Sequence, residues 1–214
     1  MPLDINRISI EDHRKIFYDF QRERNWMCFW YPRYYLLVLC GEFGELVELF
    51  EGIHENELYT VNRTKPELFE LICEELSDVF VCLIALAGNA GFNLTRIALD
   101  PTCDCKVDFK REFPVTFDDG VYFDDLASKI PEKLQQLCLF DLTIRMTRKI
   151  SQISTVYQWF PNEQREIGSE NYVKVQIEIF EFFWCLMEVS RRFGIDLNET
   201  IQKKMLKNRL KYPI

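Results

Sequence analysis

The sequence lacks any long run of apolar residues and is short of positive charge. Its longest apolar stretch, Val79 to Ala87, cannot cross a bilayer, because a transmembrane helix needs about 20 apolar residues. No apolar signal segment lies within Met1 to Arg7. Lysine and arginine number 26 against 34 aspartate and glutamate residues, which leaves a net charge of −8. This balance argues against general affinity for nucleic acid or anionic membranes, so we expect neither as a partner.

Disulfide bonds are not expected either, although the chain has eight cysteines. Without a signal segment, these cysteines predict reduced thiols in a cytoplasmic protein, with the nucleus or mitochondrion as alternatives. Cys103 and Cys105 form the one close pair, which is weak evidence for a metal site. Five others lie in helical apolar patterns and are predicted to be small buried hydrophobes. These five are Cys40, Cys73, Cys82, Cys138 and Cys185.

The remaining composition is typical of a globular helical protein. The chain has 214 residues, of which 48% are hydrophobic and 28% charged, enough for a sizeable core. Helical periodicity and capping residues predict helices from Ser9 to about residue 24, at about 33–50 and 67–89, and a short one after Asn93. Residues 52–65 have the composition of a loop. We predict an all-α fold with one module at 1–100, a linker at 101–120 and a second module at 121–214.

Two acidic pairs stand out in the predicted helices. Glu42 and Glu45 are three residues apart and project from nearly one helix face, and Glu75 and Asp78 repeat this spacing. Acidic pairs on solvated helix faces are common, so either pair alone is weak evidence. Four carboxylates beside apolar helices would repel one another without a cation, and oxygen ligands favour a hard ion such as Mg²⁺. The sequence thus indicates a Mg²⁺ site for a nucleotide polyphosphate.

Two glycines accompany the first acidic pair. Gly41 and Gly44 each weaken a helix by about 0.8–1 kcal/mol relative to alanine. Two such costs within one turn lead us to expect that another group approaches this backbone closely.

The sequence around these pairs resembles a known family. The motifs are Glu23-Arg24-Asn25-Trp26, Pro32-Arg33, the string Gly-Glu-Phe-Gly-Glu-Leu-Val-Glu-Leu-Phe at 41–50, and Glu-Glu-Leu-Ser-Asp-Val at 74–79. They are similar to those of the MazG-like nucleotide pyrophosphohydrolases, and above all to the dCTP pyrophosphatases. The resemblance is dense over residues 10–94. Its Glu-x-x-Glu and Glu-x-x-Asp motifs follow one another in the order that the family shows.

This resemblance implies an all-α fold and a concrete reaction. In the family the four acidic residues, here Glu42, Glu45, Glu75 and Asp78, bind Mg²⁺, and a nucleoside triphosphate is hydrolysed to monophosphate and pyrophosphate. One carboxylate, for which we favour Glu45, would accept a proton from water. We expect the aromatic ring of Trp26 to pack against the base of the nucleotide.

The C-terminal stretch resembles the segment with which the family closes. It reads Lys-Met-Leu-Lys-Asn-Arg-Leu-Lys-Tyr-Pro at 204–213, with Lys211 in place of the usual arginine. In the family the lysine and asparagine of this segment contact the substrate's phosphates. The resemblance thereby assigns Lys204 and Asn208, together with Tyr212, to substrate binding. A run of basic residues could also be a solvated helix end, where positive charge suits the helix dipole.

The second half echoes the first in a weaker form. Gly194 follows Gly91 at an offset of 103 residues, and the same offset places Glu178 and Glu181 at Glu75 and Asp78. An offset of 107 residues places two non-acidic residues, Lys149 and Gln152, at Glu42 and Glu45. Because an ammonium group cannot ligate Mg²⁺, we predict a degenerate second copy without metal, packed on the first as a pseudo-dimer. Two unrelated helical hairpins are the alternative.

Three positions depart from the family pattern. Phe17 stands where the family usually has histidine, Gly52 where it has tryptophan, and Cys82 where it has tyrosine. Trp159 takes the place of that tryptophan in the second copy. These changes concern base recognition, so the preference for dCTP is less secure than polyphosphate hydrolysis. Two further alternatives stay open: a non-catalytic descendant that binds a nucleotide or a protein, and pairing of two fused chains as a homodimer.

Overall fold

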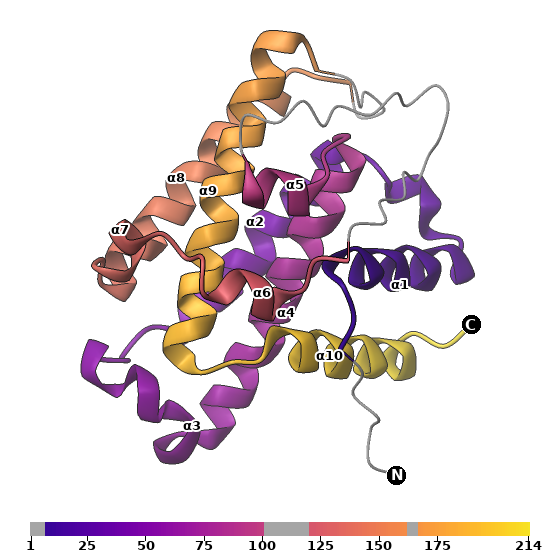
Figure 1. Cartoon of the computed structure of the whole chain (residues 1–214). Helices are drawn as coiled ribbons and strands as arrows, with labels where there is room; N and C mark the ends of the chain where they lie inside the picture. Colours follow the sequence, from indigo (N-terminus) through magenta and orange to yellow (C-terminus); the bar gives the residue numbers. More distant parts are fainter. Residues whose placement is uncertain (1–6, 101–119, 162–166) are drawn as a thin grey trace.

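The all-α class predicted from the sequence is confirmed. The structure, a computed structural model, describes residues 7–100, 120–161 and 167–214, and these ranges contain helices and no strand. Figure 1 shows the long helices packed side by side, with two further helices, α1 and α10, crossing them. No helix within these ranges is long and apolar enough to cross a membrane.

The helices of the first half lie within about two residues of their predicted bounds. Ser9 begins the first one with a capping box, since its hydroxyl accepts a hydrogen bond from the Asp12 amide at 3.0 Å while Asp12 accepts one from the Ser9 amide at 3.3 Å. Asn93 caps the short fourth predicted helix with its side-chain oxygen, which accepts a hydrogen bond from the Arg96 amide at 2.9 Å. The elements are α1 (Ile10–Glu23), the 3₁₀ helix η1 (Trp26–Phe29), α2 (Pro32–Leu49), α4 (Pro66–Asn89) and α5 (Leu94–Leu99).

The segment at 52–65 is more ordered than its loop composition predicted. It contains a 3₁₀ helix, η2 (Glu55–Thr60), and one helical turn, α3 (Val61–Thr64). Leu58 and Val61 are buried and anchor these elements to the core. The prediction was wrong because turns this short carry no helical periodicity, and their stability comes from tertiary burial.

In its described residues, the second half adds two long helices, one helix that crosses them and two short helical turns. Gly194 ends α9 in the left-handed conformation at φ 67°, and Asp196 then caps α10. The elements are α6 (Phe123–Ala127), α7 (Glu132–Gln135), α8 (Leu139–Tyr157), α9 (Ser169–Phe193) and α10 (Leu197–Lys211).

Two helix pairs form the centre of the molecule. Helix α2 packs on α4, α8 packs on α9, and the two pairs pack on each other through α2 with α8 and α4 with α9. Aromatic rings join the pairs: Phe43 meets Phe182 at 5.6 Å between ring centroids, and Phe80 meets Phe183 at 6.1 Å. Helix α10 lies against both α4 and α1, which places the C-terminal segment beside the first pair (Figure 1).

Three expectations about individual residues were wrong. Cys40 and Cys138 are exposed rather than buried. A Cβ atom added at Gly41 or Gly44 would meet nothing within 4 Å, so no described group approaches this backbone closely. Cys40 lies on an exposed side of α2, and Cys138 precedes α8 as its N-cap, so the helical pattern did not apply to it.

The predicted linker and the division into modules remain predictions. Residues 101–119 lie outside the described residues, and Cys103 and Cys105 with them.

Candidate functional site

The residues predicted from the sequence to form the site line a single pocket of about 590 Å³. Its walls come from α1, η1, α2, α4 and α10, so segments from both ends of the chain meet in it. Every site residue assigned above is present: Trp26, Glu42, Glu45, Glu75, Asp78, Lys204, Asn208 and Tyr212. The structure shows their proximity, and the individual roles stay predictions.

Three carboxylates converge at the floor of this pocket. Glu42 of α2 and Glu75 and Asp78 of α4 each offer an oxygen, and these oxygens all lie within 4.8 Å of one another. The arrangement follows from local geometry, because α2 packs on α4 and the three-residue spacing puts Glu75 and Asp78 on one face. These three residues, here called the acidic trio, are only partly exposed.

The environment of the acidic trio disfavours negative charge. Burial, then repulsion from Asp78, Glu75 and Glu45, raises the pKa of Glu42 to about 7. The pKa of Glu75 and that of Asp78 are also raised, in both cases chiefly by burial, although the nearby Lys204 opposes the shift. Without a further cation the trio is therefore electrostatically unfavourable at neutral pH.

One oxygen of the acidic trio has no polar partner. Oε2 of Glu75 is buried and accepts no hydrogen bond within the described part of the chain. A buried, unpaired carboxylate oxygen is costly, and a metal ion would satisfy it. The donor set contains oxygen only, which is what Mg²⁺ prefers. Thus the residues present fit a bound Mg²⁺ ion, with Glu42, Glu75 and Asp78 as its ligands.

Glu45 lies in the pocket but outside the acidic trio. It is exposed, and its carboxylate is not among the oxygens that converge within 4.8 Å. The same three-residue spacing brings Glu75 and Asp78 together, so the orientation of α2 against α4, and not the spacing, separates Glu45 from the trio. Glu45 as a metal ligand and Glu45 as a proton acceptor both remain predictions, and its exposure to solvent suits the second role better.

A lysine from the C-terminal helix reaches the acidic trio. Nζ of Lys204 lies 2.5 Å from Oδ2 of Asp78, and Asn208, one turn further along α10, also lines the pocket. Burial alone would lower the pKa of Lys204, but the hydrogen bond and charge of Asp78 raise it above its usual value. A firmly charged ammonium group therefore stands at the edge of the acidic trio.

Aromatic side chains form another part of the pocket wall. Trp26 packs edge-on against Phe20 at 5.7 Å and against Tyr212 at 5.4 Å between ring centroids. The chain after α10 is fixed there, because Arg24 donates a hydrogen bond to the Tyr212 carbonyl at 2.6 Å. Such a wall offers ring faces and edges to a planar group entering the pocket.

Sequence reasoning missed several residues that shape this wall. Gln21 is buried and its amide oxygen accepts hydrogen bonds from Trp30 at 2.7 Å and from Tyr35 at 2.6 Å. Phe29 stacks on Tyr34 at 4.8 Å. The sequence gives little signal for the glutamine, because its partners come from other elements. For Phe29 and Tyr34, the high density of aromatic residues at 26–35 was the signal in the sequence.

The positions that depart from the family pattern divide into two groups. Phe17 and Cys82 line the pocket, so they are placed to influence what it accepts. Trp159 is 84% exposed and lies outside the pocket lining, and Gly52 is also absent from that lining. The tryptophan of the second half therefore does not substitute for one in this pocket.

A second acidic cluster lies between α8 and α9 and contains its own cation. Nζ of Lys149 lies 2.8 Å from Glu178 and 3.2 Å from Glu181, and Arg145 lies 2.5 Å from Glu181. Lys149 is only 5% exposed. We call Lys149, Glu178, Glu181 and Arg145 the lysine cluster. Oε2 of Glu178, like that of Glu75, accepts no hydrogen bond within the described residues, but here the Lys149 ammonium group lies 2.8 Å from it and occupies the place of a cation.

Comparison with known proteins finds relatives of one kind. The chain is 36% identical to dCTP pyrophosphatase 1 of Bos taurus over 113 residues, which cover 52% of this chain and 63% of the relative. The Rattus norvegicus protein of the same name gives the same identity and coverage. The human one is 38% identical over 103 residues, or 48% of this chain and 57% of the relative.

The chain thus spans about six tenths of the length of these curated relatives. No family model matches the chain. No solved structure matches it either. Over about half of its length, this chain is similar to proteins named dCTP pyrophosphatase 1, and its all-helical architecture is consistent with a MazG-like fold.

Proposed function

We propose that the chain is a Mg²⁺-dependent pyrophosphohydrolase that converts a (deoxy)nucleoside triphosphate to its monophosphate and pyrophosphate. The observation that carries this proposal is the pocket itself, which joins the acidic trio, the Lys204 ammonium group and an aromatic wall. A magnesium triphosphate needs carboxylate oxygens for its metal, cations for its phosphates and a flat apolar surface for its base. The similarity to dCTP pyrophosphatases makes dCTP the first substrate to test.

The residues of the pocket have different roles in the proposed reaction. Glu42, Glu75 and Asp78 hold the ion, and Mg²⁺ bound there would neutralise phosphate charge and lower the pKa of bound water. Lys204 and Asn208 orient the phosphate chain from the α10 side. Glu45, exposed at the rim, accepts the proton of the attacking water.

The choice of base is made at the aromatic wall. Trp26 and Tyr212 are edge-on to each other, which leaves ring surface open to the pocket. Phe17 and Cys82 replace two polar ring-bearing residues of the family and offer no strong hydrogen bond to a base. The pocket therefore selects a planar ring by packing, and dUTP or a modified deoxynucleotide is a substrate to compare with dCTP.

The second half of the chain completes this site instead of forming its own. Helix α9 begins 103 residues after α4, the offset that aligns Glu178 and Glu181 with Glu75 and Asp78. This agreement of helix bounds supports a degenerate second copy. In that interpretation the first copy keeps the metal ligands, the second keeps Lys204 and Asn208, and one composite site results per chain.

A Lys204→Ala substitution tests the composite site. Loss of a charge-assisted phosphate contact costs about 1.5–3 kcal/mol, or about ten- to a hundredfold in kcat/KM. Glu178→Gln and Glu181→Gln are the matched controls and should leave hydrolysis nearly unchanged. If Glu181→Gln inactivates the enzyme while Lys204→Ala does not, the composite site is disproved.

A non-catalytic nucleotide-binding protein is the second candidate. Such a protein would bind a nucleotide in the same pocket and would not hydrolyse it. The unpaired Glu75 oxygen and the raised pKa of Glu42 favour a bound metal ion in either candidate, and the similarity to proteins named dCTP pyrophosphatase 1 favours catalysis.

The deciding experiment is a panel of triphosphates incubated with and without Mg²⁺, with pyrophosphate release measured directly. We expect release from at least one deoxynucleoside triphosphate, and only with the metal. Binding of triphosphates without any release would support the second candidate.

A further inference from the structure

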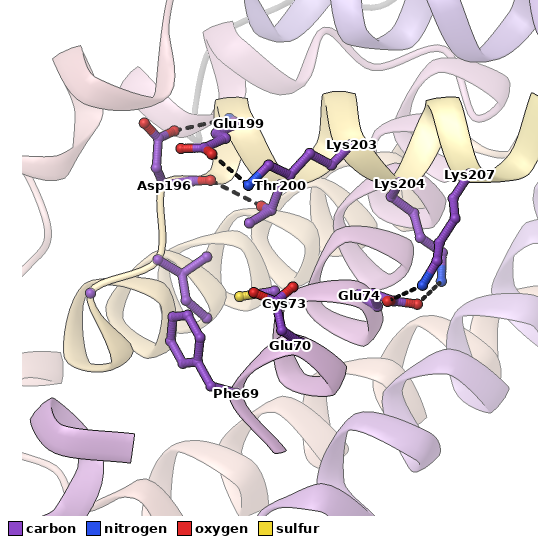
Figure 2. Close-up of a pocket in the computed structure, with 12 residues that line it drawn as sticks. Phe69, Glu70, Cys73, Glu74, Asp196, Glu199, Thr200, Lys203, Lys204 and Lys207 are labelled. Atoms are coloured by element: carbon purple, nitrogen blue, oxygen red, sulfur yellow. Dashed lines mark hydrogen bonds and ion pairs between the residues drawn. The ribbon is translucent and has the colours of Figure 1, made fainter. Parts of the chain in front are cut away.

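A further carboxylate of α4, that of Glu74, lies beside two lysines of α10. Glu74 forms an ion pair with Lys207, and its Oε2 lies 3.8 Å from Nζ of Lys204. Figure 2 shows both lysines reaching from α10 toward this one glutamate. Glu74 precedes Asp78 by one helical turn, so the two carboxylates flank Lys204 along the same face of α4.

Lys204 therefore forms ion pairs with two carboxylates, and the charge of a third, Glu75 of the acidic trio, also acts on it. Asp78 is its close partner at 2.5 Å and also belongs to the acidic trio. Glu74 lies outside that trio and lines a neighbouring pocket of about 370 Å³, in which Lys203, Lys204 and Lys207 face α4.

We propose that Glu74 is a positioning residue, which keeps the Lys204 ammonium group at the rim of the site when Asp78 binds the metal. This inference rests on the proposed function. Once a divalent cation takes the Asp78 oxygens, Lys204 loses its close partner and is repelled by the ion. Glu74 is then the carboxylate within reach that still holds the ammonium group where a phosphate can meet it.

The direction in which the triphosphate affinity changes distinguishes a positioning role from simple electrostatics. Removing one negative charge near a bound triphosphate should, by simple electrostatics, tighten the binding of that triphosphate. A positioning role predicts the opposite result for Glu74→Gln, because an unheld lysine pays conformational entropy when it binds phosphate. The expected loss is about two- to fivefold, the range typical of a partly exposed ion pair.

The experiment measures KM, kcat and the affinity for a non-hydrolysable dCTP analogue with Mg²⁺ in matched variants. Glu74→Gln should raise KM and weaken the analogue by the same factor, with kcat within about twofold, as expected when ground-state and transition-state binding fall together. Glu70→Gln is the control, because Glu70 lies one turn earlier on α4 in the same neighbouring pocket. The Glu70→Gln change also removes one negative charge, but at a position away from Lys204. It should leave the binding of the analogue unchanged or make it slightly tighter.

A double-mutant cycle shows whether Glu74 acts through Lys204. In a Lys204→Ala background, Glu74→Gln should have no further effect on KM. An effect that persists there, or a Lys207→Gln variant that reproduces the whole defect, would overturn the proposal and assign Glu74 to the docking of α10. Unchanged or tighter binding in Glu74→Gln alone would also overturn it.

Failure of the proposed function would look different. Wild-type protein that releases no pyrophosphate yet binds the analogue refutes the hydrolysis and leaves the Glu74 test to be made by binding. Wild-type protein that neither hydrolyses nor binds refutes both.

Discussion

The acidic trio and the lysine cluster differ in how the negative charges of their carboxylates are compensated. Each lies between a pair of long helices, α2 with α4 and α8 with α9, and each brings acidic side chains into a partly buried space. In the lysine cluster, Lys149 supplies a permanent cation at 2.8 Å from Glu178. In the acidic trio no residue of the described ranges fills that place, although Lys204 touches Asp78 at its edge.

The difference shows in the pKa values of the two sets. The pKa of Glu181 is lowered: burial would raise it, but hydrogen bonds from Arg145 and Lys149 outweigh that effect. The pKa of Glu42 is raised to about 7 by burial and by its acidic neighbours. The lysine cluster stabilises its own charges, whereas the acidic trio leaves them unfavourable, which is the pattern expected of the cation site that we propose.

The largest expected effect is on catalysis, from Asp78→Asn. The change keeps the side-chain volume but removes a ligand of the proposed metal. Loss of such a direct ligand should reduce pyrophosphate release by at least about a hundredfold, more than loss of the outer partners of a metal ligand. Release of pyrophosphate from dCTP or the preferred triphosphate is the measurement.

Stability should separate this variant from a merely misfolded one. Because the pKa of Asp78 is raised, its ionised form is unfavourable in the fold, so the melting temperature without Mg²⁺ should stay level or rise. Glu181→Gln, at the corresponding position of the lysine cluster, is the control and should keep full activity. If Asp78→Asn retains most of its rate, the acidic trio is not the metal site.

Much of this contrast was accessible from the sequence. The capping residues Ser9 and Asn93 and the helical periodicity predicted the main helices of the first half, because these signals are local. The spacing of Glu75 and Asp78 predicted their shared face for the same reason.

Other parts of the site depend on tertiary packing and were not predictable. The rotation of α2 against α4 decides that Glu42 joins the acidic trio and that Glu45 does not. Gln21 is recognisable only after the fold brings Trp30 and Tyr35 to it. The expectation about Gly41 and Gly44 was wrong because a helix cost need not be compensated by a close neighbour.

The second prediction concerns the stability of the fold when the cation of the lysine cluster is removed. Lys149→Met leaves Glu178 buried without its partner, and breaking a buried ion pair costs about 3–5 kcal/mol. We expect about 3 kcal/mol, since Arg145 still pairs with Glu181, and therefore a melting temperature lower by roughly 6–12 °C.

Hydrolysis by the folded Lys149→Met protein should be unchanged below its melting temperature. Arg148→Met, at the exposed neighbouring position of α8, is the control for loss of a positive charge and should melt close to the wild type. A Lys149→Met protein of wild-type stability would show that the lysine cluster contributes little to the fold.

The smallest expected effect is a pH dependence that belongs to the acidic trio alone. The fold raises the pKa of Glu42 from its ordinary value of 4.5 to about 7, so between these values the unfolded chain has lost a proton that the folded chain keeps. Stability without metal should therefore fall as pH rises through this window and level off above it. Mg²⁺ binds the ionised carboxylates of the folded chain, so its stabilising effect should grow over the same window.

Thermal melts at about pH 5 and about pH 7.5, on either side of the folded pKa of Glu42, each with and without millimolar Mg²⁺, measure this dependence. We expect a shift of a few degrees that is larger at the higher pH, increases further with a non-hydrolysable triphosphate and disappears in Asp78→Asn. The lysine cluster should add nothing to it, because a lowered pKa places the loss of stability from Glu181 below pH 4.5. Equal melting with and without both ligands at either pH would mean that the acidic trio is not a preformed cation site. In that case the contrast between the two clusters would be one of packing alone.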